Sequence, residues 1–184
     1  MARLLDAGMQ VLAARGYQAA RVDDVVRVAR LSHGTFYLYF TNKEDLFRAI
    51  ATECAEEMKA LAATLGPIDV GDAGLAELQR WLGEFLAIYG RYGAVIRAWM
   101  EDQVIDRELI ELGLEAFAAL SAAIDSRLRD AAPDHLPDLG LATKAMLAMI
   151  ERFAYFTMSR DLADDATSRD TLATMVHRGF FGAA

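Results

Sequence analysis

Residues 21–48 read RVDDVVRVARLSHGTFYLYFTNKEDLFR, and this stretch decides how the whole chain is interpreted. Apolar spacing predicts a short helix over residues 22–29, a turn at Leu31-Ser32 and a second helix of about two turns over residues 33–39. Ser32 is a natural N-cap for that second helix. A helix so short, and so rich in aromatic and small polar residues, is poorly suited to building a core. We therefore expect it to lie in a DNA groove and contact the groove walls.

Two helices joined by such a turn form a helix-turn-helix, whose second helix directs its N-terminal residues toward base edges. Here those residues are His33, Gly34 and Thr35. Gly34 has no side chain, so its backbone can approach a base or a thymine methyl closely. Lys43 begins the next helix, where free backbone N–H groups already favour an anion. The side chains that can reach phosphate are those of Ser32, Thr35, Tyr37, Tyr39 and Lys43.

The same stretch also contains residues with a structural role. Phe36 and Phe40 are four residues apart and are expected to face the core. Tyr39 is expected to be partly buried with its hydroxyl at the surface. His33 has two interpretations: a base contact or a solvated residue at the start of a helix.

Charge is unevenly distributed along the 184 residues. The net charge is −8, which taken alone does not indicate a nucleic-acid-binding protein. Residues 1–48, however, contain seven Lys or Arg and five Asp or Glu, a balance of +2, which leaves −10 for the remainder. A basic head on an acidic body would restrict polyanion binding to the head. Chance unevenness is the alternative explanation.

The remaining sequence is predicted to be helical throughout, and Gly16 is expected to stop the first helix. Alanine and leucine are abundant, only three prolines occur, and no alternating strand pattern is found. The Gly/Pro/Asp-rich residues 66–74 form the only clear internal break. The expected fold is all-α, with a three-helix head over residues 1–48 joined by a long fourth helix to a helical domain over residues 49–184. The helices expected after the break span residues 75–89, 92–102, 107–131, 141–160 and 167–180.

Other functional classes are disfavoured by the residues. A single cysteine, Cys54, suits a reducing cytoplasm and is expected to be a small buried or semi-buried residue rather than a reactive thiol. No apolar run approaches the ~20 residues needed to span a bilayer. The three histidines are scattered, and neither metal-ligand spacing, a phosphate-binding Gly loop nor a nucleophile elbow occurs. We therefore expect a cytoplasmic protein that is not an enzyme and has no catalytic residues, metal or cofactor.

The string LSHGTFYLYFTNKEDLF resembles the DNA-binding signature of the TetR family of bacterial regulators, and RVDDVVRVA and LLDAGMQVLAARGY match that family's first two helices. The resemblance covers about residues 3–50. It implies base-edge contacts by His33 and Gly34, backbone contacts by Thr35, Tyr37, Tyr39 and Lys43, and an outward Leu38 that could touch a base or a methyl group.

Two positions depart from the family pattern. A glycine commonly ends the family's second helix, but Arg30 stands here, which can cost roughly 1 kcal/mol of backbone strain. A threonine pair often starts that helix, but Ala20-Arg21-Val22 occupies the place. Arg21 could contact phosphate through its charge, although the cap would be lost.

The resemblance also implies a dimer, a palindromic operator and a small-molecule effector that releases the DNA from a repressor. We expect helices 141–160 and 167–180 to pair with a second copy, the first through Ala145, Ala148, Met149, Arg152 and Phe156, and the second through Leu172, Met175, Val176 and Phe180. Burial of these stripes within one chain is the alternative. A largely apolar effector site is expected among Phe85, Tyr89, Trp99, Met100, Gln103, Phe117, Met146, Met149 and Phe153, although the same stripe is typical of any helical core.

Two further functions remain open at this point. A helical ligand carrier without DNA binding would leave the surface aromatic residues of 33–39 unexplained. An activator of the same family would share every feature discussed above. The sequence identifies neither the effector nor the operator.

Overall fold

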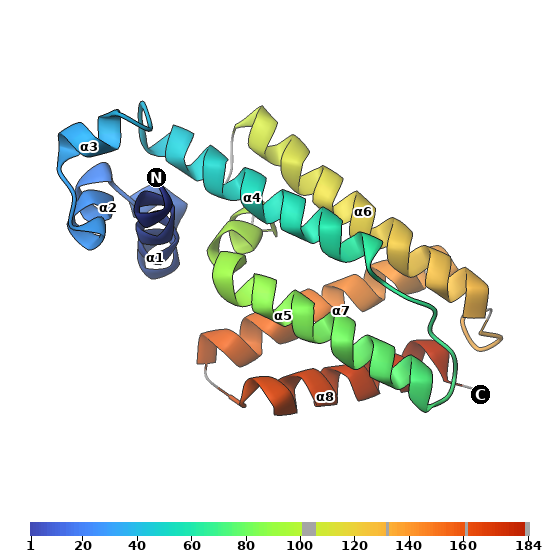
Figure 1. Cartoon of the computed structure of the whole chain (residues 1–184). Helices are drawn as coiled ribbons and strands as arrows, with labels where there is room; N and C mark the ends of the chain where they lie inside the picture. The colour runs from blue at the N-terminus through green and yellow to red at the C-terminus, as the bar shows by residue number, and fades with distance from the viewer. Residues whose placement is uncertain (101–105, 132, 161, 183–184) are drawn as a thin grey trace. The chain divides into compact units, whose positions relative to one another are not determined.

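The computed structural model describes residues 1–100, 106–131, 133–160 and 162–182 (Figure 1). No strand occurs among these residues, so the predicted all-α fold is confirmed. The helices predicted over residues 22–29, 33–39, 107–131 and 141–160 each begin and end within two residues of an observed helix. The elements are α1 (Ala2–Ala19), α2 (Val22–Ala29), α3 (His33–Tyr37), α4 (Lys43–Ala63), α5 (Asp72–Met100), α6 (Arg107–Ala131), α7 (Leu139–Arg160), α8 (Asp165–Val176) and the π-helix η1 (His177–Phe181).

Internal contacts divide the chain into two compact units. The first comprises Met1–Glu57 and Arg91–Ala116, and the second comprises Met58–Gly90 and Phe117–Ala184. Helices α4, α5 and α6 each contribute residues to both units. The functional boundary expected after residue 48 therefore falls inside the first unit.

In the first unit, α1, α2 and α3 form a small three-helix group (Figure 1). Leu4 and Leu12 of α1 and Val25 and Val26 of α2 bury their side chains in its core. Gly16 interrupts α1 with φ 73° and ψ 168°, a conformation that glycine adopts without a steric penalty. The predicted end of the first helix at Gly16 is thus seen as a break in its helical geometry.

The only cysteine of the sequence lies in this unit. Cys54 of α4 is completely buried, and burial raises the pKa of its thiol, with the nearby Glu57 carboxylate acting in the same direction. Glu57 is itself engaged, because it accepts a hydrogen bond from the Tyr92 hydroxyl at 2.9 Å and pairs with Arg91. Burial and the raised pKa of this thiol agree with the expected role of Cys54 as a small core residue rather than a reactive group.

The second unit is built around the first part of α5. Trp81 is completely buried and donates from Nε1 to the carbonyl of Leu61 at 3.0 Å. The predicted break between residues 89 and 92 was wrong, because α5 runs through it without interruption. Gly90 does not end the helix, since a glycine inside a helix costs only about 1 kcal/mol and long flanking segments compensate for it.

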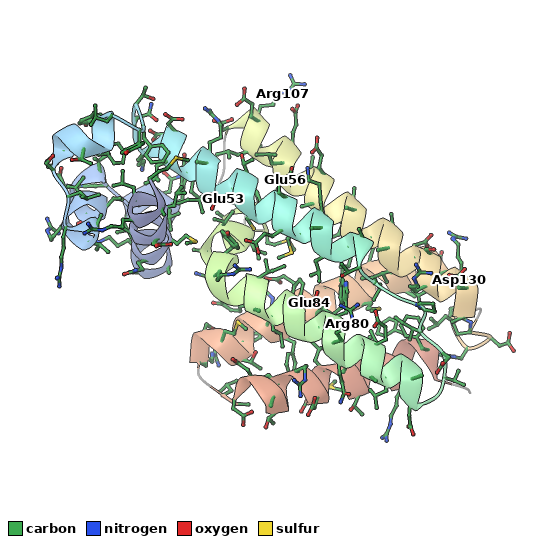
Figure 2. All side chains as sticks on the ribbon, viewed as in Figure 1. Glu53, Glu56, Arg80, Glu84, Arg107 and Asp130 are labelled. Carbon is green, nitrogen blue, oxygen red and sulfur yellow. The ribbon has the colours of Figure 1, made fainter. Side chains whose placement is uncertain are left out.

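The Glu77 carboxylate of α5 holds the loop that precedes this helix. Glu77 accepts from the Gly66 backbone N–H at 2.6 Å and from Arg80 Nη2 at 2.6 Å. These hydrogen bonds, with that from Arg80 the strongest, hold the pKa of Glu77 below its ordinary value of 4.5 although burial opposes them. Arg80 also donates to Glu84 at 2.8 Å, and the two side chains lie together on α5 (Figure 2).

Helices α7 and α8 lie side by side in the second unit (Figure 1). Asp164 caps α8 by accepting from the Thr167 N–H at 2.8 Å. The stripe predicted on residues 167–180 is wrong in part, because Leu172 and Val176 are completely buried within the chain. With only 12 residues, α8 turns most of its apolar side chains inward and leaves Met175 exposed.

The stripe predicted on α7 lies mostly at the surface. Ala145, Ala148, Arg152 and Phe156 are exposed, and Met149 is half-buried. No helix in the described part of the chain combines the length and the apolar character needed to cross a bilayer.

Candidate DNA-binding interface

Helices α2 and α3 and the turn between them form the predicted helix-turn-helix. Arg30 ends α2 in the left-handed conformation, with φ 53° and ψ 46°. It is the only non-glycine residue with a positive φ in the described part of the chain. The N–H of Leu31 then bonds to the carbonyl of Val26 at 3.0 Å, which closes the helix end as a glycine normally would. The chain therefore keeps the turn that a glycine would allow, and Arg30 accepts the backbone strain of the left-handed conformation.

The start of each helix follows the sequence closely. Ser32 caps α3, since its Oγ accepts from the Thr35 N–H at 3.1 Å and lies 3.0 Å from Thr35 Oγ1. Arg21 precedes α2 without a side-chain cap bond, as the missing threonine pair predicts. Helix α3 ends at Tyr37 rather than at the predicted residue 39, and Tyr39 and Phe40 continue the turn through bonds to the Phe36 carbonyl.

The two sides of α3 and its following turn differ sharply in exposure. Phe36 is 0% exposed and Phe40 5%, with ring centroids 5.7 Å apart, as their spacing predicted. Tyr37 is 58%, Leu38 81% and Tyr39 51% exposed. Tyr39 is therefore only half-buried. Large apolar surface seldom stays exposed on so small an element unless it meets a partner.

His33, the first residue of α3, is paired with an acid of α2. Its Nε2 lies 2.7 Å from Oδ1 of Asp23, and the side chains are 56% and 68% exposed respectively. The hydrogen bond from His33 is the main reason why the pKa of Asp23 is lowered, with Arg27 and Arg21 contributing through their charges. His33 is thus an oriented surface group and not merely a solvated one.

Lys43 joins the end of α1 to the start of α4. Its Nζ donates to the carbonyls of Tyr17, Gln18 and Ala20, each at 3.2 Å, and lies 5.2 Å from the centroid of the Tyr17 ring. The break at Gly16 leaves these carbonyls available. A phosphate contact by Lys43 would therefore require one of its three N–H groups to leave a carbonyl.

The start of α4 is capped by side chains. Asn42 Oδ1 accepts from the Asp45 N–H at 2.8 Å, and Asp45 Oδ2 accepts from the Thr41 N–H at 3.0 Å. This reciprocal arrangement resembles a capping box and fixes the angle at which α4 leaves the turn.

Asp24 is a residue of this region whose role the sequence reasoning missed. It is buried, and its Oδ1 lies 3.0 Å from Arg27 Nη1 and 3.4 Å from Arg15 Nη2. Its Oδ2 has no hydrogen-bond partner in the described structure. The spacing of Asp24 and Arg27 on one helix face was the available signal.

Comparison of the sequence with known proteins also points to a helix-turn-helix regulator. Residues 4–50 fit the model of bacterial regulatory proteins of the tetR family. The HTH-type transcriptional regulator EthR of Mycolicibacterium smegmatis is 30% identical over 189 residues, covering 96% of this chain and 82% of the relative. The chain belongs to the TetR family. Its relatives are named as transcriptional regulators, and it is a DNA-binding transcriptional regulator of that family rather than an enzyme.

Solved structures agree on the fold. A TetR-family regulatory protein from Rhodococcus RHA1 has a TM-score of 0.78 at 17% identity, covering all of this chain and 97% of the other. The transcriptional regulator FadR from Bacillus subtilis, solved in complex with stearoyl-CoA, has a TM-score of 0.69 at 18% identity, covering 97% of this chain and 98% of the other.

The residues predicted to line a ligand site are divided between the two units. Of the residues predicted to line a ligand site in the second unit, Phe85, Tyr89 and Met146 are buried, and the Tyr89 hydroxyl donates to Glu151 Oε1 at 2.9 Å. Met149 and Phe153 are half-buried, and Phe117 is exposed.

Two predicted ligand residues lie in the first unit. In the first unit, Trp99 donates from Nε1 to the Leu109 carbonyl at 2.7 Å, and Met100 is exposed. Gln103 lies outside the described residues.

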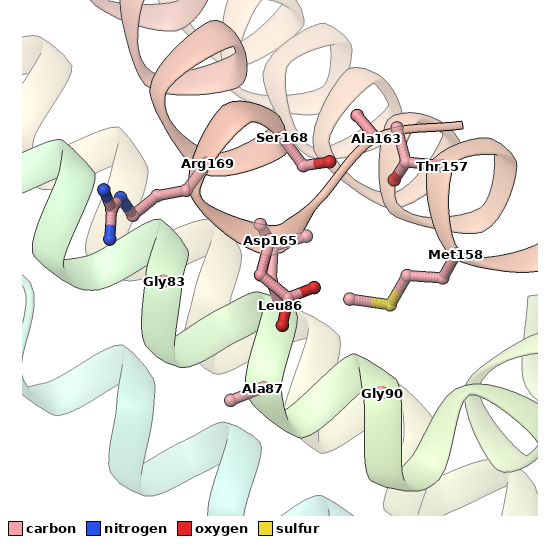
Figure 3. Close-up of a pocket in the computed structure, with 10 residues that line it drawn as sticks. All are labelled: Gly83, Leu86, Ala87, Gly90, Thr157, Met158, Ala163, Asp165, Ser168 and Arg169. Carbon is pink, nitrogen blue, oxygen red and sulfur yellow. The ribbon is translucent and has the colours of Figure 1, made fainter. Parts of the chain in front are cut away.

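A cavity of about 490 Å³ opens in the second unit between α5, α7 and the start of α8 (Figure 3). None of the residues predicted to bind ligand lines it. Ser168, which lines the cavity, is 5% exposed. The lining residues are Gly83, Leu86, Ala87, Gly90, Thr157, Met158, Ala163, Asp165, Ser168 and Arg169.

Small side chains on α5 create this space. Gly83, Ala87 and Gly90 recur at helical spacing and leave the helix backbone as one wall. Figure 3 shows the hydroxyls of Thr157 and Ser168 near the same opening, whereas the Arg169 side chain extends away along α5. Since sequence reasoning searched for aromatic and methionine residues, small residues gave no signal.

Proposed function

We propose that this chain is a ligand-responsive repressor that binds a palindromic operator as a homodimer in the cytoplasm and is released by a small, largely apolar effector. The observation that carries the proposal is the exposed surface of Tyr37, Leu38 and Tyr39 over the buried Phe36 and Phe40. A head over residues 1–48 reads DNA, and residues 49–184 bind the effector and dimerise.

In this proposal α3 enters the major groove. His33 and Gly34 approach base edges, and Leu38 touches a base or a thymine methyl. The remaining contacts go to the DNA backbone and set the register of the head without reading sequence. They are made by Arg21, Ser32, Thr35, Tyr37, Tyr39 and Lys43.

Dimerisation follows from the small size of α3. One such helix reads too few bases for useful specificity, whereas two copies about 34 Å apart address successive turns of one DNA face. The exposed residues of α7, which include Phe156, and Met175 of α8 supply an apolar surface for a second copy. Light scattering checks this directly: the wild type should be a dimer and Phe156→Glu a monomer, and a monomeric wild type at micromolar concentration would refute the dimer.

The effector site is proposed at the cavity of the second unit. Its volume suits a small organic molecule, and its Leu86, Ala87 and Met158 surfaces suit an apolar one with a hydrogen-bonding group for Ser168. The structural neighbour FadR, solved with stearoyl-CoA, is a TetR-like fold with a bound ligand that has a long apolar chain. The predicted residues Phe85, Tyr89, Met146, Met149 and Phe153 would then shape the core next to the site.

Release of DNA is proposed to work by linkage. An effector that binds more tightly to a conformer unsuited to the operator shifts the protein toward that conformer and lowers its affinity for the operator. Operator DNA then lowers the affinity for the effector by the same factor. Helix α4 runs continuously from Lys43 into the second unit and is the proposed mechanical connection.

The deciding experiment is selection of bound DNA from a random pool, followed by titration of the enriched site. A palindromic site should emerge, and Tyr37→Ala should weaken binding to every sequence alike, by roughly 10-fold, because it removes a backbone contact. Tyr37→Phe, which keeps the ring, serves as the control. No enriched sequence would favour the carrier alternative.

The effector part has its own variants. Ala87→Phe should fill the cavity and abolish ligand-induced release while operator binding persists. Ala76→Phe is the matched control, because Ala76 is an exposed position of the same helix that does not line the cavity. A reporter gene under the selected site separates a repressor from an activator, which remains the second candidate.

A further inference from the structure

The cavity of the second unit carries an acidic side chain at its mouth. Asp165, the first residue of α8, lines the cavity and is exposed. Figure 3 shows its carboxylate over Leu86 and directed into the opening, with the hydroxyls of Thr157 and Ser168 facing the same space. A carboxylate only accepts hydrogen bonds, and a hydroxyl can also accept, so the polar side of the cavity favours a ligand that donates.

The charges around the mouth favour a cation. Residues 164–170 contain three acids and one base, Arg169. The Arg169 side chain extends away from the opening along α5 (Figure 3), and its Nε donates to Asp170 Oδ1 at 2.8 Å. The first turn of a helix would favour an anion, but at α8 Asp164 Oδ1 already accepts from the Thr167 N–H at 2.8 Å, and Asp165 adds a second acid there. An anionic ligand would therefore be repelled.

The rest of the lining suits an alkyl chain. Gly83, Ala87 and Gly90 leave the backbone of α5 as one wall, and Leu86 and Met158 add apolar surface. No aromatic ring occurs among the described residues that line the cavity. Ring faces are what typically hold a quaternary ammonium group. The cavity therefore favours an ammonium group that still carries N–H donors.

We propose that the effector is a primary or secondary alkylamine in its protonated form. Its ammonium group donates to the Asp165 carboxylate and to the hydroxyls of Thr157 and Ser168, while its apolar chain lies along α5. The inference rests on the proposed effector role of this cavity and assigns the chemical class of its ligand. An alcohol or a carboxylate with the same chain fills the same apolar space, so the discrimination lies in the charge of the headgroup.

The test measures binding of four probes to the full-length protein by isothermal titration calorimetry at pH 7. The probes are octylamine, octanol, octanoate and octyltrimethylammonium, each below its micelle-forming concentration. We expect octylamine to bind about 10-fold more tightly than each of the others, because it alone combines a positive charge with N–H donors. Raising the ionic strength should narrow the difference between octylamine and octanol.

Variants of Asp165 test the acidic mouth directly. Asp165→Asn should weaken octylamine binding by roughly 5-fold and leave octanol binding unchanged, since only the charged headgroup loses its partner. Asp165→Lys should reverse the order of octylamine and octanoate. Asp134→Asn is the matched control, because Asp134 is an exposed acid of the second unit that does not line the cavity, and its loss changes the net charge equally. If Asp165→Asn binds octylamine as tightly as Asp134→Asn while both remain folded by circular dichroism, the proposal is overturned.

Ala87→Phe separates the ammonium assignment from the cavity itself. Because it fills the space, it should abolish binding of octylamine and octanol alike. If the wild type binds octanol or octanoate as tightly as octylamine and Ala87→Phe abolishes that binding, the cavity remains the effector site and the ammonium assignment is wrong. If octylamine binds Ala87→Phe unchanged, or if no probe binds the wild type, the cavity assignment fails first and the proposal fails with it.

Discussion

The helix-turn-helix and the α5–α7–α8 region differ in how clearly their residues reveal function. On α3, five residues long, and at Leu38 just after it, buried Phe36 and exposed Tyr37 and Leu38 are neighbours, so side chains that do not build the core stand out. On the 29-residue α5, Phe85 and Tyr89 look like pocket residues but are buried in the core, and the cavity is formed by glycine and alanine. On a short exposed element, residues that contact a partner can be told apart from core residues by their sequence pattern, whereas on a long amphipathic helix they cannot.

The largest effect is expected from breaking the core side of α3. Phe36→Ala should lower the free energy of unfolding by about 3–5 kcal/mol, because a completely buried ring leaves a cavity. Leu38→Ala, two residues away and exposed, should change it by less than about 0.5 kcal/mol. Urea denaturation of both variants measures the contrast, and equal losses would mean that α3 does not have two distinct sides.

The next effect concerns the buried pair in the second unit. Tyr89→Phe should cost about 1–3 kcal/mol, since it removes a donor from the buried Glu151 carboxylate. Tyr92→Phe is the matched variant and should cost less, because its acceptor Glu57 is more exposed and keeps Arg91. Thermal unfolding gives both values. A loss of effector response without loss of stability in Tyr89→Phe would instead return Tyr89 to the binding site.

A stabilising change tests the turn. Arg30→Gly should raise the free energy of unfolding by about 1 kcal/mol, because glycine accepts the left-handed conformation without a Cβ penalty. Arg30→Ala keeps the Cβ and should bring no such gain. Chemical denaturation of both variants decides the matter, and a gain from alanine would place the effect in the side chain.

The smallest effect is a pH-dependent one at Glu77. Because its pKa is lowered on folding, its stabilisation is present above its ordinary value of 4.5 and is lost as pH falls through the lower folded-state value. Glu77→Gln should therefore cost about 1 kcal/mol at pH 7 and nothing in strong acid. Glu84→Gln, which loses only a more exposed contact with Arg80, should be nearly neutral at every pH. Thermal unfolding over pH 3–7 makes the comparison.

Sequence reasoning was most successful where one residue type permits one local structure. Ser32 was predicted as a cap, Gly16 as a helix break, and Phe36 and Phe40 as core, and all four are confirmed. The continuity of α5 was missed because Gly90 looks like a terminator when flanking packing is unknown. The contacts of Asp23 with His33 and of Asp24 with Arg15 were missed because these residues become neighbours only after folding, whereas the spacing of Asp24 and Arg27 was a local signal that was overlooked. The cavity was missed because absent side chains leave no pattern.

Because Cys54 is buried in α4, the reactivity of its thiol can report how often this part of the helix opens. The thiolate is the nucleophile that attacks a thiol reagent, so a completely covered sulfur with a raised pKa can react only during transient unfolding of its surroundings. Its labelling rate under native conditions therefore measures how often this part of α4 opens. Following that rate with operator DNA present, and again with a ligand, would reveal which partner tightens the helix, without any engineered probe.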